Sequence, residues 1–154
     1  MLADDLIKTA RLLANSGKNK PRQADLRRAI STAYYAMLTK CCADLIVGTP
    51  GAQRSPEAWH QVYRALEHGA AKSACANKTI IKKFPAPIQD FAHLFLEMQV
   101  KRHSADYDPN EKFFKSAVSI DITFVEIVIH HFKSAPIKDR RAFAVFVLFK
   151  PPRS

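Results

Sequence analysis

The stretch QADLRRAISTAYYAMLTKCCADLIV, residues 23–47, decides the fold class of this chain. Its apolar side chains recur at steps of three or four residues, a spacing that gathers them on one face of a helix. This face carries Leu26, Ile30, Ala33, Met37, Cys41 and Leu45. Gly48 follows directly, and glycine commonly ends a helix. The stretch therefore predicts an amphipathic α-helix of about seven turns.

Four further segments show the same helical spacing and are separated by Pro, Gly and polar clusters. They run from about Leu2 to Ser16, from Ser55 to the residues before Phe84, from Pro85 to Arg102, and from Pro109 to about Lys133. The start near Pro109 is inferred because Asp108 suits an N-cap and Glu111 suits the acid of a capping box. The segment from Pro109 to about Lys133, the fifth in chain order, is apolar around much of its circumference, so we expect it to be the central, most buried helix.

The last segment, KDRRAFAVFVLFK at residues 138–150, has a Phe and Val content that would also suit a β-strand. A lone strand would have no sheet to join, so we expect a short helix instead. The chain is thus predicted to be one all-α domain over residues 1–154. Its architecture is an up-and-down helical bundle of four to five main helices plus a short C-terminal helix. The core lies at about 1–135 and the C-terminal segment at 136–154.

The composition is that of an ordinary globular protein with a large excess of positive charge. A chain of 154 residues, 47% of them hydrophobic, can bury a core without disulfides or metals. The net charge of +10 fits an anionic partner, with nucleic acid first, because each phosphate neutralised by Lys or Arg releases counterions. The alternative is that the charge maintains solubility or docks an acidic protein.

Several classes of function are disfavoured by strings that the sequence lacks. It has no Gly-rich phosphate loop, HExxH, paired CxxC or GxSxG, so we expect no cofactor. Its six histidines lack the spacing of a zinc site, so we expect no metal. The adjacent Cys41 and Cys42 suggest reduced thiols. No apolar run is long enough to span a membrane, and the acidic N-terminal stretch does not resemble a signal peptide, so a cytoplasmic protein is expected.

Arg102 is the most informative single residue. In the segment from Pro85 to Arg102, apolar residues recur at helical spacing through Phe95 and Met98, and the next position on the same face is Arg102. A guanidinium on an inward stripe must either find an acceptor or face a wet cleft. One interpretation is a buried ion pair, for instance with Asp106. The other is that Arg102 binds a phosphate or stabilises charge in a reaction, with Tyr107 nearby.

A polar row lies beside the apolar face of the helix at 23–47. It consists of Arg27, Ser31 and either Tyr34 or Tyr35, each three or four residues from the last. Such a row normally faces water. The bulky Ser-x-x-Tyr-Tyr pattern would equally suit the wall of a groove into which Arg102 projects.

Two motifs stand out, RRAISTAYYAML at residues 27–38 and KRHSADYDP at residues 101–109. Together they resemble the HEPN superfamily of small helical proteins. Their order is similar to that of the stand-alone bacterial group with an AYYA helix and an Arg-x-x-Ala-Asp-Tyr loop, and the resemblance covers about residues 1–135. It implies a helical bundle that commonly dimerises and cuts RNA without metal, using an Arg and a His at the dimer cleft. Many members are toxins or defence proteins paired with a minimal nucleotidyltransferase antitoxin.

The resemblance assigns roles to particular residues. Arg102 matches the family Arg, Tyr107 stands where the family has its His, and His103 lies beside them. It implies an RNA-binding protein that acts as an endoribonuclease through these three residues, with Arg27, Ser31, Tyr34 and Arg102 contacting RNA. It also implies that Tyr107 is the target of nucleotidyl transfer by an antitoxin. The alternative is a non-catalytic helical module that docks a nucleotidyltransferase or another protein partner.

Overall fold

The chain folds as a bundle of α-helices, as its periodicity predicts. A computed structural model describes residues 2–17, 20–38, 55–65 and 68–149. The helices, in chain order, are α1 (Leu2–Asn15), α2 (Gln23–Leu38), α4 (Pro56–Ala65), α5 (His68–Ala76), α6 (Lys78–Ile81), α7 (Ala86–Tyr107), α8 (Lys115–Ser134) and α9 (Ile137–Leu148). No strand occurs within these ranges. The all-α fold class is therefore confirmed.

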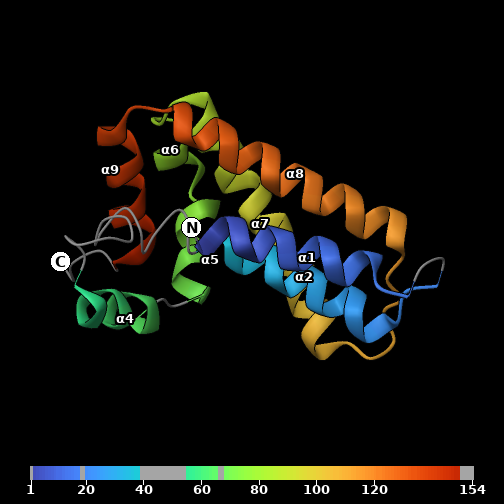
Figure 1. The fold of residues 1–154 in the computed structure, drawn as a ribbon. Helices are drawn as coiled ribbons and strands as arrows, with labels where there is room; N and C mark the ends of the chain where they lie inside the picture. Colours follow the sequence, from blue (N-terminus) through green and yellow to red (C-terminus); the bar gives the residue numbers. More distant parts are fainter. Residues whose placement is uncertain (1, 18–19, 39–54, 66–67, 150–154) are drawn as a thin grey trace.

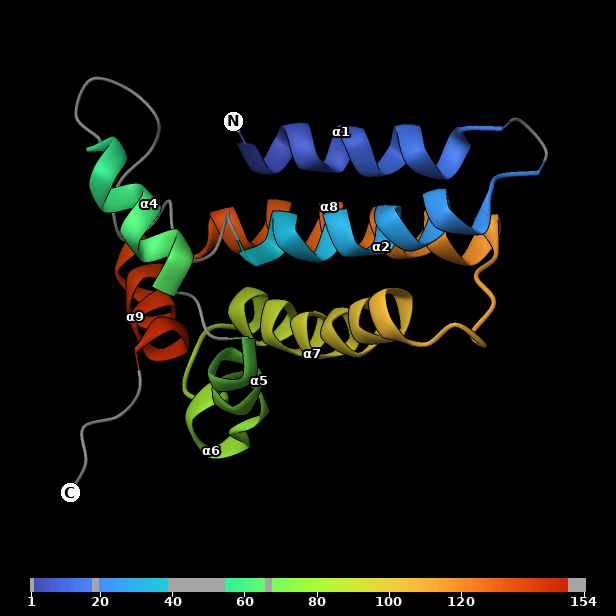
Figure 2. The ribbon, with the colours of Figure 1, turned by 90° about the horizontal axis from the view of Figure 1, so that it is seen from below.

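Four helices, α1, α2, α7 and α8, lie side by side and form the body of the molecule (Figure 1). Each runs opposite to the one before it in the chain, so the bundle has the predicted up-and-down course (Figure 2). Helix α2 contacts all three of the others. Helices α5, α6 and α9 gather at one end of the bundle, where α8 ends (Figures 1 and 2).

The core is built mainly from α2 and α7. The largest fully buried side chains are Tyr34, Phe91, Phe95, Phe132, Phe143, Leu26, Ile30, Met37, Ile88, Met98 and Ile122. Burial of a side chain of this size contributes about 1.5 to 3 kcal/mol to folding. The predicted apolar stripe of the helix at 23–47 thus meets the core as far as α2 is described. Residues 39–47, including Cys41 and Cys42, lie outside the described residues.

The prediction that the fifth helix is the most buried is wrong. One side of α8 is buried through Val118, Ile122 and Val125, but the opposite side leaves Ile120 and Phe124 exposed. When apolar residues lie around a whole helix, the sequence does not indicate which side packs against the core. Helix α8 therefore contributes one face to the bundle and presents a second apolar face at the surface.

The predicted boundaries between the fourth and fifth helices are also wrong. Helix α7 continues through Tyr107, so the expected Arg-x-x-Ala-Asp-Tyr loop is helical, and α8 begins only at Lys115. Asp108 caps a local turn, accepting from the amide of Asn110 at 2.9 Å. The amide side chain of Gln23 exchanges two hydrogen bonds with the backbone of Phe113, at 2.7 and 2.9 Å. These contacts tie the connection to α2, and residues 108–114 are a turn and irregular backbone where a helix was expected.

The predicted third helix is divided into α4, α5 and α6. Asn77 separates the last two, because its side chain caps α6 by accepting from the amide of Ile80 at 3.3 Å. The side chains of Trp59, Val62 and Leu66, expected on this helix, lie outside the described part.

The C-terminal segment is a helix, as predicted. Phe143 of α9 meets the rings of Phe84, Phe91 and Phe132 at centroid distances of 5.6, 5.9 and 6.0 Å. Helix α9 thus closes the end of the core. None of the helices described combines the length and apolar character needed to cross a bilayer.

Candidate functional site

Arg102 projects from the second-last turn of α7 toward α2. Its side chain is only 15% exposed. Its Nε lies 2.9 Å from Oδ2 of Asp106, one turn later on the same helix. The ion pair with Asp106, one of the two interpretations that the sequence left open, is therefore present. The Nε–H bond does not point along the line to the carboxylate, so the contact is coulombic rather than a linear hydrogen bond.

Three tyrosine rings surround the Arg102 guanidinium. Its Cζ lies 5.7 Å from the ring centroids of both Tyr34 and Tyr35 on α2, and 5.9 Å from that of Tyr107 on α7. Cations bind favourably to aromatic faces at such distances. The Nη2 of Arg102 also donates to the hydroxyl oxygen of Tyr35 at 3.2 Å. The guanidinium is thus held in one orientation by contacts from two helices.

These contacts keep the cation charged. Burial acts to lower the pKa of Arg102, but Tyr35, Asp106 and Tyr34 outweigh it and raise the pKa above its ordinary value. Because Arg102 is a base whose folded-state pKa is raised, its charge would be lost only in strongly alkaline solution. Arg102 is therefore a permanent, preoriented cation.

The solvent side of the site is formed by Tyr107 and His103. Tyr107 is 65% exposed, and its ring centroid lies 5.0 Å from that of His103, which is also exposed. The helix places the two side chains four residues apart on the same face. Within the last turns of α7, a fixed cation thus lies beside two exposed rings that carry a hydroxyl and an imidazole.

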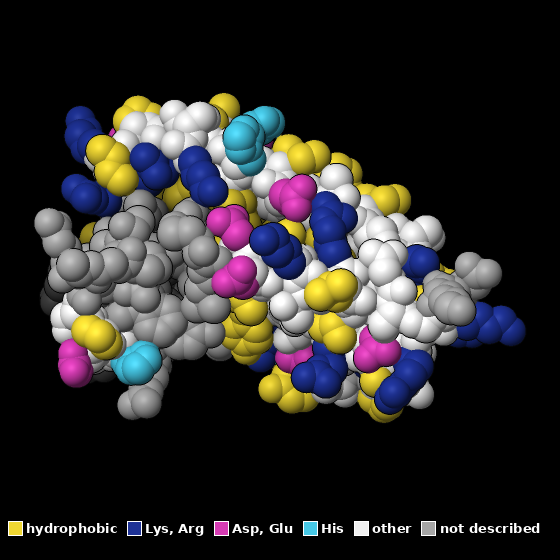
Figure 3. Space-filling view, viewed as in Figure 1, with side chains coloured by type: hydrophobic (Ala, Val, Ile, Leu, Met, Phe, Trp, Pro, Cys, Tyr) yellow, Lys and Arg dark blue, Asp and Glu magenta, His cyan; other side chains and the backbone are white. Residues whose placement is uncertain are grey.

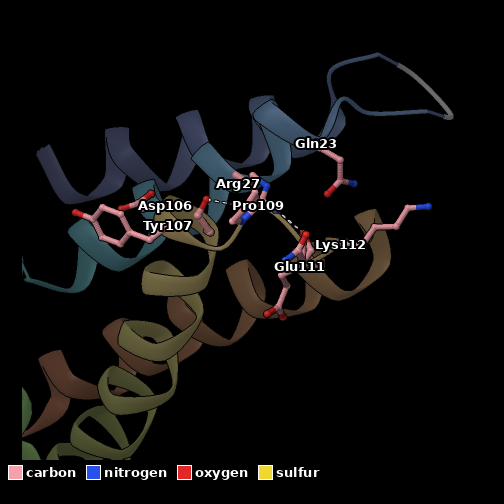
Figure 4. A pocket seen from close by; sticks show the side chains of 9 residues that line it. Gln23, Arg27, Asp106, Tyr107, Pro109, Glu111 and Lys112 are labelled. Carbon is pink, nitrogen blue, oxygen red and sulfur yellow. Dashed lines mark hydrogen bonds between the residues drawn. The ribbon is translucent and has the colours of Figure 1, made fainter.

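A surface hollow of about 760 Å³ adjoins Tyr107. Figure 4 shows Asp106 and Tyr107 on one side of it and Gln23 and Lys112 on the other, with Arg27 between them. Glu111 lines it as well. The hollow is open to solvent and carries charges of both signs.

Arg27 serves the architecture of the site. Its Nη1 donates to the carbonyl oxygen of Asp108 at 2.8 Å. The same Nη1 donates to that of Ala105 at 2.9 Å, and Nη2 donates to that of Glu111 (Figure 4). The guanidinium also lies 5.2 Å from the ring centroid of Phe113. Most of its donors are therefore turned toward the backbone at the end of α7, so Arg27 holds that end in place.

Both tyrosines of the polar row of α2 contact Arg102, but in different ways. Tyr34 has no exposed surface, so it supports Arg102 from within the core and offers no surface to a ligand. Tyr35 is half-buried and makes the polar contact, a role that the sequence offered only as an alternative to Tyr34. Ser31 is half-buried one turn earlier on α2. The adjacency of the two motifs is thus observed.

Metal-ligating side chains do not cluster in the described ranges: no group of three or more His, Cys, Asp or Glu residues there could hold an ion. Comparisons with known proteins add no assignment. No protein-family model, curated protein or solved structure matches this chain.

Proposed function

We propose that this protein is a HEPN-type RNA-binding protein that cleaves RNA without a metal ion, as part of a bacterial toxin–antitoxin or phage-defence system. The observation that supports this most is the preoriented Arg102 beside the exposed pair of Tyr107 and His103. A guanidinium recognises phosphate, and exposed aromatic rings stack on bases. Both parts of a nucleotide would thus find a partner within two turns of α7.

In the proposed reaction, the ribose 2′-oxygen attacks the adjacent phosphorus while the bond from phosphorus to the 5′-oxygen breaks. Arg102 stabilises the charge on the non-bridging phosphate oxygens. His103 accepts the proton of the 2′-hydroxyl, because a neutral imidazole has one ring nitrogen with a free lone pair. Tyr107 donates its proton to the leaving 5′-oxygen, and His103 then returns a proton to Tyr107. The products are a cyclic 2′,3′-phosphate and a free 5′-hydroxyl.

The test is cleavage of short model RNAs and total RNA by wild-type protein and Arg102→Ala, with chelator present. We expect fragments from the wild type and none from the variant. Arg11→Ala is the matched control, because Arg11 also pairs with an acid, Glu126 at 3.4 Å, but between α1 and α8. Cleavage that survives in a folded Arg102→Ala protein contradicts the assignment.

We also propose that the protein is a homodimer formed through the exposed face of α8. This face carries the stripe Ala117, Ile120, Phe124, Ile127 and His131. The stripe repeats at alternating steps of three and four residues, the spacing of helix-pairing positions. Phe124 at its centre is 52% exposed. A two-fold axis through Phe124 would pair the stripe with itself.

Light scattering on the purified protein tests the dimer. Phe124→Glu should be monomeric at concentrations where the wild type is dimeric, because the carboxylate would have to be buried between two helices. Ile137→Glu removes a comparably exposed side chain on α9 and should stay dimeric. A monomeric wild type, or an unchanged Phe124→Glu mass, refutes this interface.

A second candidate function is a non-catalytic module regulated by a nucleotidyltransferase. The observation that favours it is the exposed hydroxyl-bearing Tyr107 at the position of the family His. The partner would transfer a nucleotidyl group from a nucleoside triphosphate to the Tyr107 oxygen and release pyrophosphate. Intact-mass measurement after incubation with a minimal nucleotidyltransferase and ATP tests this. Wild type and Tyr35→Phe should gain mass while Tyr107→Phe does not, and equal labelling of Tyr107→Phe contradicts it.

A further inference from the structure

The positive charge of this chain is concentrated in two segments. Residues 68–84 contain four lysines and no acidic residue, and residues 130–141 contain four Lys or Arg residues and one acid, Asp139. Together these two segments account for seven of the ten net positive charges of the whole chain. The charge is thus strongly uneven along the sequence.

The fold brings the two segments to the same end of the bundle. Helices α5, α6 and α9 and the last turn of α8 lie there in both ribbon views (Figures 1 and 2). Lys and Arg side chains gather over α9 and the adjoining end of α8 (Figure 3). The exposed cations that form this basic end are Lys72, Lys78, Lys82, Lys83, Lys133, Lys138 and Arg141. None of the seven pairs with a carboxylate of another described residue.

The Arg102 site lacks this excess charge. Over residues 102–112 the acids Asp106, Asp108 and Glu111 outnumber Arg102 and Lys112 by one. Even with Arg27 of α2 counted, the local formal charge is only zero. Binding of RNA depends on positive charge that displaces counterions from many phosphates. The site can therefore position one nucleotide, but the affinity for a longer strand has to come from elsewhere on the protein.

We propose that the basic end is a second RNA-binding surface, which holds the phosphate backbone of a strand whose reacting nucleotide lies at Arg102. This inference rests on the proposed function, because it takes RNA as the anion. The cations come from α5, from α6 and the two residues directly after it, and from α8 and α9, helices that point in different directions (Figure 2). A flexible strand can follow such a distribution, whereas a flat lipid surface touches only one side of it.

The separation of the two surfaces sets a minimum RNA length. Helix α7 begins at the basic end with Ala86, and at about 1.5 Å per residue Arg102 lies roughly 24 Å along it. A stacked strand advances about 3.4 Å per nucleotide, so about seven nucleotides are needed to reach from one surface to the other. Affinity should therefore rise sharply with RNA length once this span is exceeded.

The test is fluorescence anisotropy with labelled single-stranded RNAs of about 4 and about 20 nucleotides at several salt concentrations. The variant combines Lys82→Gln, Lys83→Gln and Arg141→Gln. For the long RNA, loss of three phosphate contacts should lower the log–log salt slope by about 2 and weaken binding on the order of 50-fold at physiological salt. Binding of the short RNA should not change.

A control triple variant, Lys8→Gln with Lys20→Gln and Arg22→Gln, removes the same number of exposed charges from other parts of the chain. It should bind the long RNA within a few-fold of wild type. Equal weakening by both triple variants overturns the inference, because net charge alone would then explain it. Unchanged long-RNA binding by the basic-end variant, with loss of binding to phosphatidylserine vesicles instead, also overturns it and identifies a lipid surface.

The two proposals fail in different ways. If Arg102→Ala abolishes cleavage but the basic-end variant binds long RNA normally, the proposed function stands and the second surface is refuted. If the basic-end variant loses long RNA while Arg102→Ala cleaves normally, the second surface stands and the role of Arg102 is refuted. A wild type that binds neither RNA refutes both.

Discussion

Replacing Arg27 with alanine should destabilise the protein by about 3 to 4 kcal/mol. The two part-buried hydrogen bonds to the carbonyls of Ala105 and Asp108 have lengths of 2.9 and 2.8 Å. Hydrogen bonds from a charged group contribute about 1.5 kcal/mol or more each. The contact with the Phe113 ring adds about 0.5 kcal/mol. In a domain of this size the loss corresponds to a fall in Tm of about 6 to 16 °C.

The assay is urea and thermal unfolding followed by far-UV circular dichroism. Arg28→Ala is the matched control, because Arg28 is the neighbouring exposed arginine on the same helix, and its loss should change stability by less than about 0.5 kcal/mol. Arg27→Lys keeps the charge but loses the planar set of donors, so it should recover about half of the stability. An Arg27→Ala protein that loses less than about 1 kcal/mol would refute the reasoning. Loss of RNA affinity at unchanged stability would instead support the predicted contact of Arg27 with RNA.

Three further substitutions test other parts of the fold by the same unfolding assay. Phe143→Ala should lose about 3 to 5 kcal/mol, because it empties the centre of the aromatic cluster that docks α9; a loss below about 1 kcal/mol would mean that α9 is not part of the core. Gly17→Ala should lose about 1 kcal/mol or more, because Gly17 has φ of +77° and an added Cβ would lie 2.9 Å from the carbonyl oxygen of Lys20. Lys101→Met should lower the free energy of unfolding by about 1 to 2 kcal/mol, because it leaves the largely buried Asp121 carboxylate without the cation 2.6 Å away. A double variant, Asp121→Asn with Lys101→Met, should recover part of this loss.

The fold class was predictable because apolar residues recur at steps of three and four in each main helix. The helix boundaries before α8 were not, because their determinants lie far apart in the chain. Asp108 and Glu111 have the local pattern of a helix start, but Gln23, ninety residues before Phe113, ties that backbone to α2. A long-range tether of this kind leaves no periodic signal in the sequence.

The candidate site was predictable in outline and not in detail. The stripe that arrives at Arg102 and the tyrosines of α2 indicated that these elements meet, and they do. The two adjacent tyrosines differ by about 100° around the helix, and only the packing decides which one is buried. The stripe on α8 shows the same limit, because its composition is that of a core face. Exposure depends on the number of neighbouring helices, which periodicity does not report.

The hydrogen bonds that Arg27 makes stabilise the last turn of α7, and the contacts of this turn with Arg102 depend on the turn staying folded. Asp106 and Tyr107 belong to that turn, and Arg102 depends on both of them for its orientation. Helix ends are where native proteins open most easily without unfolding as a whole. If this turn frays, the ion pair with Asp106 and the ring contact with Tyr107 are lost together, while the bundle stays folded and Tyr34 and Tyr35 of α2 still contact Arg102. Opening of this one turn would therefore remove both contacts at once, and amide hydrogen exchange at residues 104–108 would report the population of the open state directly.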